Sequence, residues 1–256
     1  MSHHSCAADC DAALEQFRKR SSVVRWVWFW LKLIWLTLTT RRLPGLLSPL
    51  LSPNEPHDVE GLENVPRDGT FILALNHFRG ASTLEVVAVV LTALQRVRPD
   101  AVEQMLIITG RRTAPRQLGL VARLFRSLIN WGLSRWSDHN VRVTKNGGPE
   151  SSLTALKQWR ELSKSKPSLV FPEGQAHLTM ASLRPNAGLW LRALPAPALP
   201  VAVWWVDGHW HIRFGETLEW VRNKELSDVQ LGLAIADMLP TELTPYWNPL
   251  RQRLAR

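Results

Sequence analysis

The chain has 256 residues, a formal net charge of +9 and only two cysteines. Its length allows one α/β domain with a small appendage, and so few cysteines exclude a disulfide framework and fit a reducing, cytosolic setting. The positive charge predicts an anionic partner, and thirteen tryptophans against one tyrosine favour a membrane surface over nucleic acid, for which no recognition motif occurs.

Residues 1–20 form a polar tail of mixed charge that lacks the pattern of a cleavable signal peptide. The tail carries Cys6 and Cys10 close to His3 and His4, which are residue types that bind metals. A structural zinc site needs preorganised ligands, however, and this tail has little apolar surface to fold around. We therefore predict no metal site.

A run of apolar and tryptophan side chains occupies residues 23–38 and is interrupted by Arg25 and Lys32. The run is shorter than the roughly 20 apolar residues that a membrane-spanning helix needs. The two cations lie seven residues apart and share one stripe of a helix, and basic residues flank the run at 18–20 and 41–42. This pattern predicts a monotopic or peripheral helix in the interface of the cytoplasmic leaflet. A single span and a buried core helix are the alternatives.

A proline-rich connector completes this N-terminal segment of residues 21–56, and a globular domain follows at 57–256. Residues 71–75 are apolar without alternation, which is typical of a strand buried on both faces of a largely parallel sheet. The other predicted strands are 105–109, 141–143, 168–171, 199–206 and 210–214, and the predicted helices are 86–96, 118–133, 151–163 (capped by Ser151), 185–194 and 227–238. This alternation predicts a mixed, mostly parallel α/β sheet covered by helices, with one antiparallel edge.

Polar residues follow two of these strands. Asn76 and His77 come directly after residues 71–75, and Glu173 follows the strand at 168–171 within a sharp turn. Ligands of open α/β sheets bind beyond the carboxyl ends of the strands, so these side chains are well placed to converge on a site. The simpler alternatives are an Asn-His pair that caps a turn and a tight turn that only ends a strand.

The order and spacing of these motifs resemble the glycerolipid acyltransferase family, which includes 1-acylglycerol-3-phosphate O-acyltransferase. The resemblance is carried by NH at 76–77, FPEG at 171–174, Gly188, LPV at 199–201 and RFGE at 213–216. It implies the family's α/β fold and transfer of an acyl chain to a hydroxyl of a lysophospholipid or related lipid, in phospholipid biosynthesis or remodelling. The implied co-substrate is acyl-CoA or acyl carrier protein, without a further cofactor, and the implied partner is the bilayer surface.

The resemblance also implies roles for individual residues. His77 would be the general base that takes the proton of the attacking hydroxyl, and the family's pattern needs no covalent intermediate. Glu173 would help to hold the headgroup of the acceptor, and amides near Gly174 would donate to an anion. The implied substrate-binding residues are Asn76, Arg79, Lys145, Phe171, Pro172, Glu173, Gly174 and Arg184.

The chain departs from the family most clearly beside the predicted base. The family has an aspartate five residues after the histidine, where this chain has Ser82. Either the Ser82 hydroxyl or Glu85, one helical turn further on, would then orient the imidazole. Loss of the aspartate also leaves open a catalytically weakened or inactive lipid-binding relative, and an interfacial hydrolase or a transferase with another acceptor is a third reading.

Two further departures concern cations that would bind phosphate. Ala176 replaces the arginine that the family usually has two residues after the FPEG glycine. The motif between the two strand ends is blurred, with Arg142 and Lys145 as its nearest cations. Arg79 and Arg184 are the other candidates for phosphate recognition.

Overall fold

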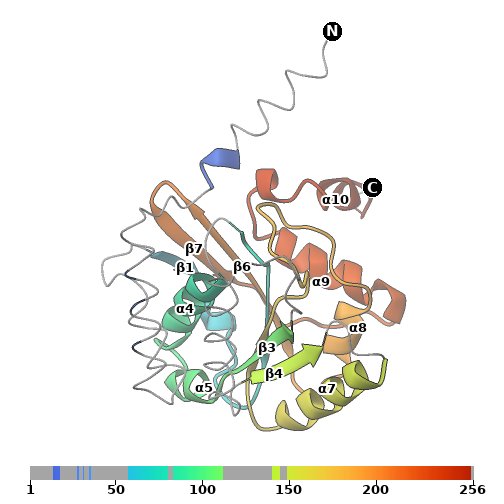
Figure 1. Cartoon of the computed structure of the whole chain (residues 1–256). Helices are drawn as coiled ribbons and strands as arrows, with labels where there is room; N and C mark the ends of the chain where they lie inside the picture. The colour runs from blue at the N-terminus through green and yellow to red at the C-terminus, as the bar shows by residue number, and fades with distance from the viewer. Residues whose placement is uncertain are drawn as a thin grey trace, which may run out of the picture.

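The computed structural model describes residues 14–17, 28, 31, 35, 57–79, 83–111, 140–144 and 149–254. Its centre is a seven-stranded sheet with the order β1-β7-β6-β2-β5-β3-β4 (Figure 1). The strands are β1 (His57–Glu60), β2 (Ile72–Leu75), β3 (Leu106–Arg111), β4 (Asn140–Thr144), β5 (Ser168–Val170), β6 (Ala198–Val206) and β7 (His209–Phe214). Neighbouring strands of this sheet are parallel except β6 and β7, which confirms the predicted mixed, mostly parallel sheet.

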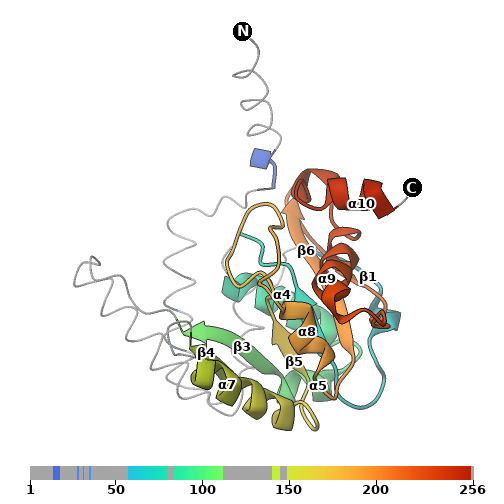
Figure 2. The ribbon, with the colours of Figure 1, turned by 90° about the vertical axis from the view of Figure 1, so that its right-hand side faces the viewer.

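Helices cover both faces of the sheet. The α-helices are α4 (Thr83–Leu94), α5 (Pro99–Gln104), α7 (Pro149–Leu162), α8 (Ala187–Arg192), α9 (Ser227–Ala236) and α10 (Asn248–Leu254), and the 3-10 turns are η2 (Leu62–Asn64), η4 (Lys224–Leu226) and η5 (Thr241–Leu243). Figure 1 and Figure 2 agree that α4 and α5 lie on one face, and α7, α8 and α9 on the other. Connections between parallel strands are right-handed, so their direction along the sheet decides which face they cover. The connection after β2 runs toward β3 and the connection after β5 runs the opposite way, toward β6, which places them on opposite faces.

The core is centred on β2, whose four residues are all buried. The strand pairs in parallel with β5 on one side and with β6 on the other, so Ile72 is level with both Ser168 and Ala198. Helix α4 supplies much of the covering layer, because eight of its twelve residues are buried. Each fully buried aliphatic side chain contributes roughly 1.5–3 kcal/mol. The two ends of β2 are therefore firmly placed.

Most predicted elements lie within a few residues of the observed ones, but three details differ. The predicted cap Ser151 is wrong, because α7 begins at Pro149, and proline is favoured in the first helical turn. Helix α5 was not predicted, and it also begins with a proline, Pro99. The short stretch β1 pairs in parallel with β7, so the antiparallel pair lies one strand in from the edge of the sheet.

Several predicted segments lie outside the described residues. These include the helix at 118–133 and nearly all of residues 1–20 and 21–56. The described exceptions are residues 14–17, of which Leu14 and Phe17 pack against the core, and residues 28, 31 and 35, which are helical. A search of the described residues alone finds no helix with the length and hydropathy that a bilayer span requires.

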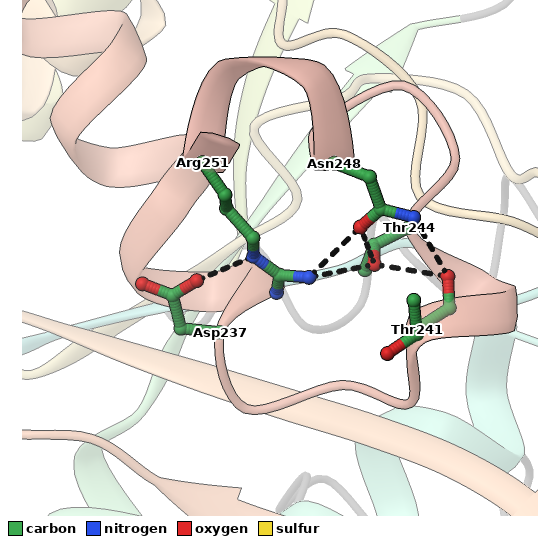
Figure 3. A network of polar contacts seen from close by, with 5 residues as sticks. All are labelled: Asp237, Thr241, Thr244, Asn248 and Arg251. Carbon is green, nitrogen blue, oxygen red and sulfur yellow. Dashed lines mark hydrogen bonds and ion pairs between the residues drawn. The ribbon is translucent and has the colours of Figure 1, made fainter. Parts of the chain in front are cut away.

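The C-terminal segment is held by a polar network around Arg251 (Figure 3). The Arg251 guanidinium donates to Asp237 Oδ1 at 2.6 Å, Asn248 Oδ1 at 2.9 Å and Thr244 Oγ1 at 3.1 Å, which joins α10 to α9 and η5. The network places Trp247, whose ring packs on Gly232 of α9 so closely that a Cβ atom there would overlap it. Trp247 Nε1 also donates to the carbonyl of Ala181 at 3.1 Å. The C-terminus thereby supports the segment that follows β5.

Gly232→Ala should destabilise the protein by about 1–3 kcal/mol, because the added methyl group must displace the Trp247 ring. Urea unfolding of the purified protein measures this loss. The same substitution in a Trp247→Ala background should be neutral or stabilising, because alanine is the better helix former once the ring is absent. An equal loss in both backgrounds would show that the contact between the two residues is not the cause.

Candidate active site

The candidate site lies at the carboxyl ends of the neighbouring strands β2 and β5. The connections that leave these strands run in opposite directions and over opposite faces, so the gap between the two strand ends is a topological switch point. Open α/β sheets bind their ligands at such points. His77 follows β2 and Glu173 follows β5, so the structure brings together the two strand ends that the sequence singled out.

The contact between these strand ends is made by the carboxylate of Glu173. Its Oε1 atom accepts a hydrogen bond from the backbone N–H of His77 at 2.5 Å, and its Oε2 atom accepts one from the N–H of Ala181 at 2.8 Å. The side chain is buried. Glu173 therefore fixes the main chain on both sides of the site, and its predicted contact with a headgroup stays a prediction.

The environment of Glu173 changes its acidity. Burial raises the pKa of Glu173 from 4.5 to about 7, and the hydrogen bonds from His77 and Ala181 oppose this rise because they stabilise the charged form. The carboxyl group therefore changes its protonation state near neutral pH. Because the Glu173 carboxyl joins two segments of the site, its protonation state affects how these segments are held together.

The imidazole of His77 is held on two sides. Its Nε2 atom lies 3.0 Å from Thr83 Oγ1, in a hydrogen bond with the first residue of α4. The Phe171 ring stacks on it with a centroid separation of 4.4 Å and an interplanar angle of 26°. The predicted partner Ser82 lies outside the described residues, and Glu85 is half-buried in the first turn of α4. Their predicted roles beside His77 stay predictions.

Asn76 makes its side-chain hydrogen bonds with the neighbouring strand. Its Nδ2 atom donates to the carbonyl of Val203 at 2.9 Å, and its Oδ1 atom accepts from the N–H of Val203 at 2.7 Å. The amide thereby extends the pairing of β2 with β6 beyond the last strand pair, Leu75 with Val201. Both ends of this buried amide bind the main chain, and its predicted contact with substrate stays a prediction.

The FPEG turn brings Arg184 to the site. Gly174 has a φ of 67°, a left-handed conformation that favours glycine, and its N–H donates to the carbonyl of Phe171 at 3.0 Å. The carbonyl of Pro172 accepts from the N–H of Arg184 at 3.0 Å, and the Arg184 side chain lies against Gly174 so closely that a Cβ atom there would overlap it. An exposed guanidinium is thus placed beside the turn.

The chain beyond β2 is tied to the segment after the FPEG turn. His177 N–H donates to the carbonyl of His77 at 3.0 Å, and Arg79 N–H donates to the carbonyl of His177 at 2.8 Å. Arg79 is exposed two residues after the predicted base, whereas Lys145 lies outside the described residues. Over the residues whose positions are given, no three side chains of metal-binding type are grouped to hold an ion.

Two residues of the site were missed by sequence reasoning. Thr83 carried a weak signal, as a hydroxyl residue near the expected start of the helix after His77. His177 carried another, as a histidine three residues after the FPEG glycine. Neither signal indicates a direction for the side chain, because that direction depends on the phase of a helix or the path of a loop.

Comparisons with known proteins find similarity to solved structures. No family model matches the chain, and none of the curated proteins matches it at a significant level. The chain is similar in structure to the 1-acyl-sn-glycerophosphate acyltransferase PlsC from Thermotoga maritima, with 17% sequence identity and a TM-score of 0.48. The match covers 80% of this chain and 85% of that one.

Glu173→Gln should change how stability depends on pH. Because the folded-state pKa is raised, the stability that the protonated carboxyl contributes is fully present below about pH 4.5 and is lost as pH rises through about 7. Between these limits the free energy of unfolding of the wild type should therefore fall by about 3 kcal/mol relative to that of the glutamine variant. Urea unfolding at several pH values measures the difference.

The matched control is Glu225→Gln, which changes an exposed glutamate of η4. It should keep the pH profile of the wild type. A difference between wild type and Glu173→Gln that is the same at pH 4.5 and pH 8 would contradict the raised pKa of Glu173.

Proposed function

We propose that the protein is a membrane-associated O-acyltransferase. It moves an acyl chain from acyl-CoA or acyl carrier protein to a hydroxyl of a lysophospholipid or related lipid, in phospholipid biosynthesis or remodelling. The observation that carries this proposal is the position of the His77 imidazole at the switch point of the sheet, where the backbone N–H of His77 donates to Glu173 of the FPEG turn. The sequence resemblance described above supplies the reaction class.

His77 acts as a general acid and base in this reaction. The acyl acceptor is an alcohol, which must lose its proton as it attacks the thioester carbonyl, and a neutral imidazole is suited to take that proton at neutral pH. The same proton then passes to the thiolate that leaves. General acid and base catalysis of this kind contributes about 10²- to 10⁴-fold to a rate. Glu173 serves as a positioning residue, because it binds the main chain of His77.

Two arginines support a phosphate-bearing headgroup as the acceptor's polar end. Arg184 lies against Gly174 of the FPEG turn, and Arg79 follows His77 by two residues. Guanidinium groups bind phosphate through paired hydrogen bonds, which lysine cannot reproduce. These two side chains take the place of the arginine that the chain lacks at Ala176.

Attachment to the membrane is supported by three helical residues near the N-terminus. Trp28, Leu31 and Trp35 are 63%, 53% and 66% exposed, and their spacing places them on one stripe of a helix. Large apolar side chains exposed together in this way are typical of surfaces that contact other molecules or lipid. Attachment suits the reaction, because drawing an acyl chain out of a bilayer costs about 0.8 kcal/mol for each CH₂ group exposed.

The variant Trp28→Glu with Trp35→Glu should bind lipid vesicles at least about tenfold more weakly, a change of ~1.4 kcal/mol or more. Carboxylates on this stripe would have to be desolvated on entering the lipid. Flotation with vesicles that contain anionic phospholipid measures the binding. Val221→Glu with Leu226→Glu is the control, because it introduces the same two charges at apolar residues that are 40% and 48% exposed. Equal loss in both proteins would assign the effect to net charge alone.

His77→Ala should lower acyl transfer by about 10²- to 10⁴-fold, because it removes the proton acceptor. The assay uses the full chain with acyl-CoA donors and a panel of lysophospholipids in mixed micelles. His177→Ala is the matched control, since its main-chain hydrogen bonds remain. Undiminished transfer by His77→Ala would remove the proposed mechanism.

A second candidate function is a lipid-binding relative without turnover. It is favoured by Ser82, which stands where the family has the aspartate that supports the catalytic histidine. Lipid binding by the wild type with no product from any donor and acceptor pair would select this candidate.

A further inference from the structure

The segment after the FPEG turn is bound through three consecutive peptide groups. The N–H of Met180 donates to the carbonyl of Leu243 at 2.7 Å. The next N–H, that of Ala181, donates to Glu173 Oε2 at 2.8 Å, and the carbonyl of Ala181 accepts from Trp247 Nε1 at 3.1 Å. The amide that binds the carboxylate therefore lies between two peptide groups that are both held by the C-terminal segment, residues 241–254.

These contacts are made away from solvent. Glu173, Met180, Leu243 and Trp247 are all buried, so water cannot readily replace a partner that is lost. The indole is itself held in place, because its ring packs closely on Gly232 of α9. Trp247 therefore presents a fixed hydrogen-bond donor to the segment that contains Ala181.

The series of contacts ends at the proposed base. Glu173 accepts from Ala181 with one carboxylate oxygen and from the N–H of His77 with the other, at 2.5 Å. If the Ala181 amide moves, the carboxylate either follows it or loses a donor, and both outcomes change how the end of β2 is held. A displacement of about 1 Å at a catalytic group can cost about 100-fold in rate.

We infer that Trp247 is a positioning residue of the reaction, which acts through Ala181 and Glu173 to keep His77 in the geometry that acyl transfer needs. This inference rests on the proposed function and goes beyond it. It assigns part of the catalytic geometry to a residue that lies 66 positions beyond Ala181 and outside the sequence motifs.

The acidity of Glu173 offers a direct readout of this link. Burial raises the pKa of Glu173 to about 7, and the amides of His77 and Ala181 oppose that rise. Loosening the Ala181 amide should therefore raise the pKa of Glu173 further. A change at Trp247 leaves in place the other titratable or charged side chains on the surrounding elements, which are His77, Arg79, Glu85, His177 and Arg184.

The first test is kinetic and uses Trp247→Phe, which keeps an aromatic ring and removes the indole N–H. The full chain is assayed with palmitoyl-CoA and the lysophospholipid that the wild type uses best, in mixed micelles. The variant should lower kcat at least about tenfold and keep the KM of the acceptor within about twofold. A positioning residue acts on the reacting geometry, so the effect falls on kcat.

The second test needs no turnover. Urea unfolding of the wild type and of Trp247→Phe is measured at a series of pH values. Because the folded-state pKa of Glu173 is raised further in the variant, its free energy of unfolding should continue to fall at higher pH, with the midpoint of that fall about half a unit or more above that of the wild type. In a Glu173→Gln background, the cost of Trp247→Phe should not depend on pH.

Trp159→Phe is the matched control. Trp159 is also buried, and its Nε1 atom donates to Ser168 Oγ at 3.0 Å, at the amino end of β5 and away from the site. The control loses the same kind of hydrogen bond, and it should keep both kcat and the pH midpoint. If Trp247→Phe does not fold, Gly232→Ala, which displaces the same ring, should show both changes.

The outcomes separate this inference from the proposed function. Trp247→Phe with the kcat and pH midpoint of the wild type, or an equal change in Trp159→Phe, would overturn the role of Trp247 while acyl transfer by His77 stands. A wild type that forms no product overturns the proposed function. The unfolding profile then decides by itself whether Trp247 acts on Glu173.

Discussion

A buried carboxylate, that of Glu173, holds the candidate site together. It accepts one hydrogen bond from the end of β2 and another from Ala181, in the segment that follows β5. A carboxylate taken out of water loses solvation free energy, so its position is tolerated only where donors compensate, and here main-chain amides provide them. The carbonyl of Ala181 in turn accepts a hydrogen bond from the indole N–H of Trp247. The site is therefore connected through successive hydrogen bonds to the C-terminal network around Arg251.

This construction explains why the polar side chains of the motifs divide into two groups. Asn76 and Glu173 direct their polar atoms at the main chain and hold the strand ends in place. His77, the proposed base, has its backbone and its ring held by different partners. A site supported from the ends of rigid strands keeps its geometry better than one built on loops alone, which is what proton transfer over about 3 Å requires.

The proposed chemistry and the proposed membrane attachment through the N-terminal stripe of Trp28, Leu31 and Trp35 support each other physically. An acyltransferase for lipids works on chains that are stable only in a bilayer, so an enzyme attached at the interface avoids the cost of extracting them. The net charge of +9 acts in the same direction, because anionic leaflets attract basic proteins. The proposed arginine contacts, from Arg79 and Arg184, extend this preference for anions to the headgroup.

The sequence by itself determined the buried strand at 71–75 and the two motif-bearing turns, because these follow from local apolar patterns and turn residues. The convergence of His77 and Glu173 was also foreseeable, since neighbouring parallel strands end at one edge of a sheet. Only the tertiary structure decided that Asn76 binds Val203, which is 127 residues away, and that β1 joins β7. It also decided that Thr83 is bound to the imidazole. Side-chain direction depends on helix phase and on which strands become neighbours, and both are set by packing across the whole domain.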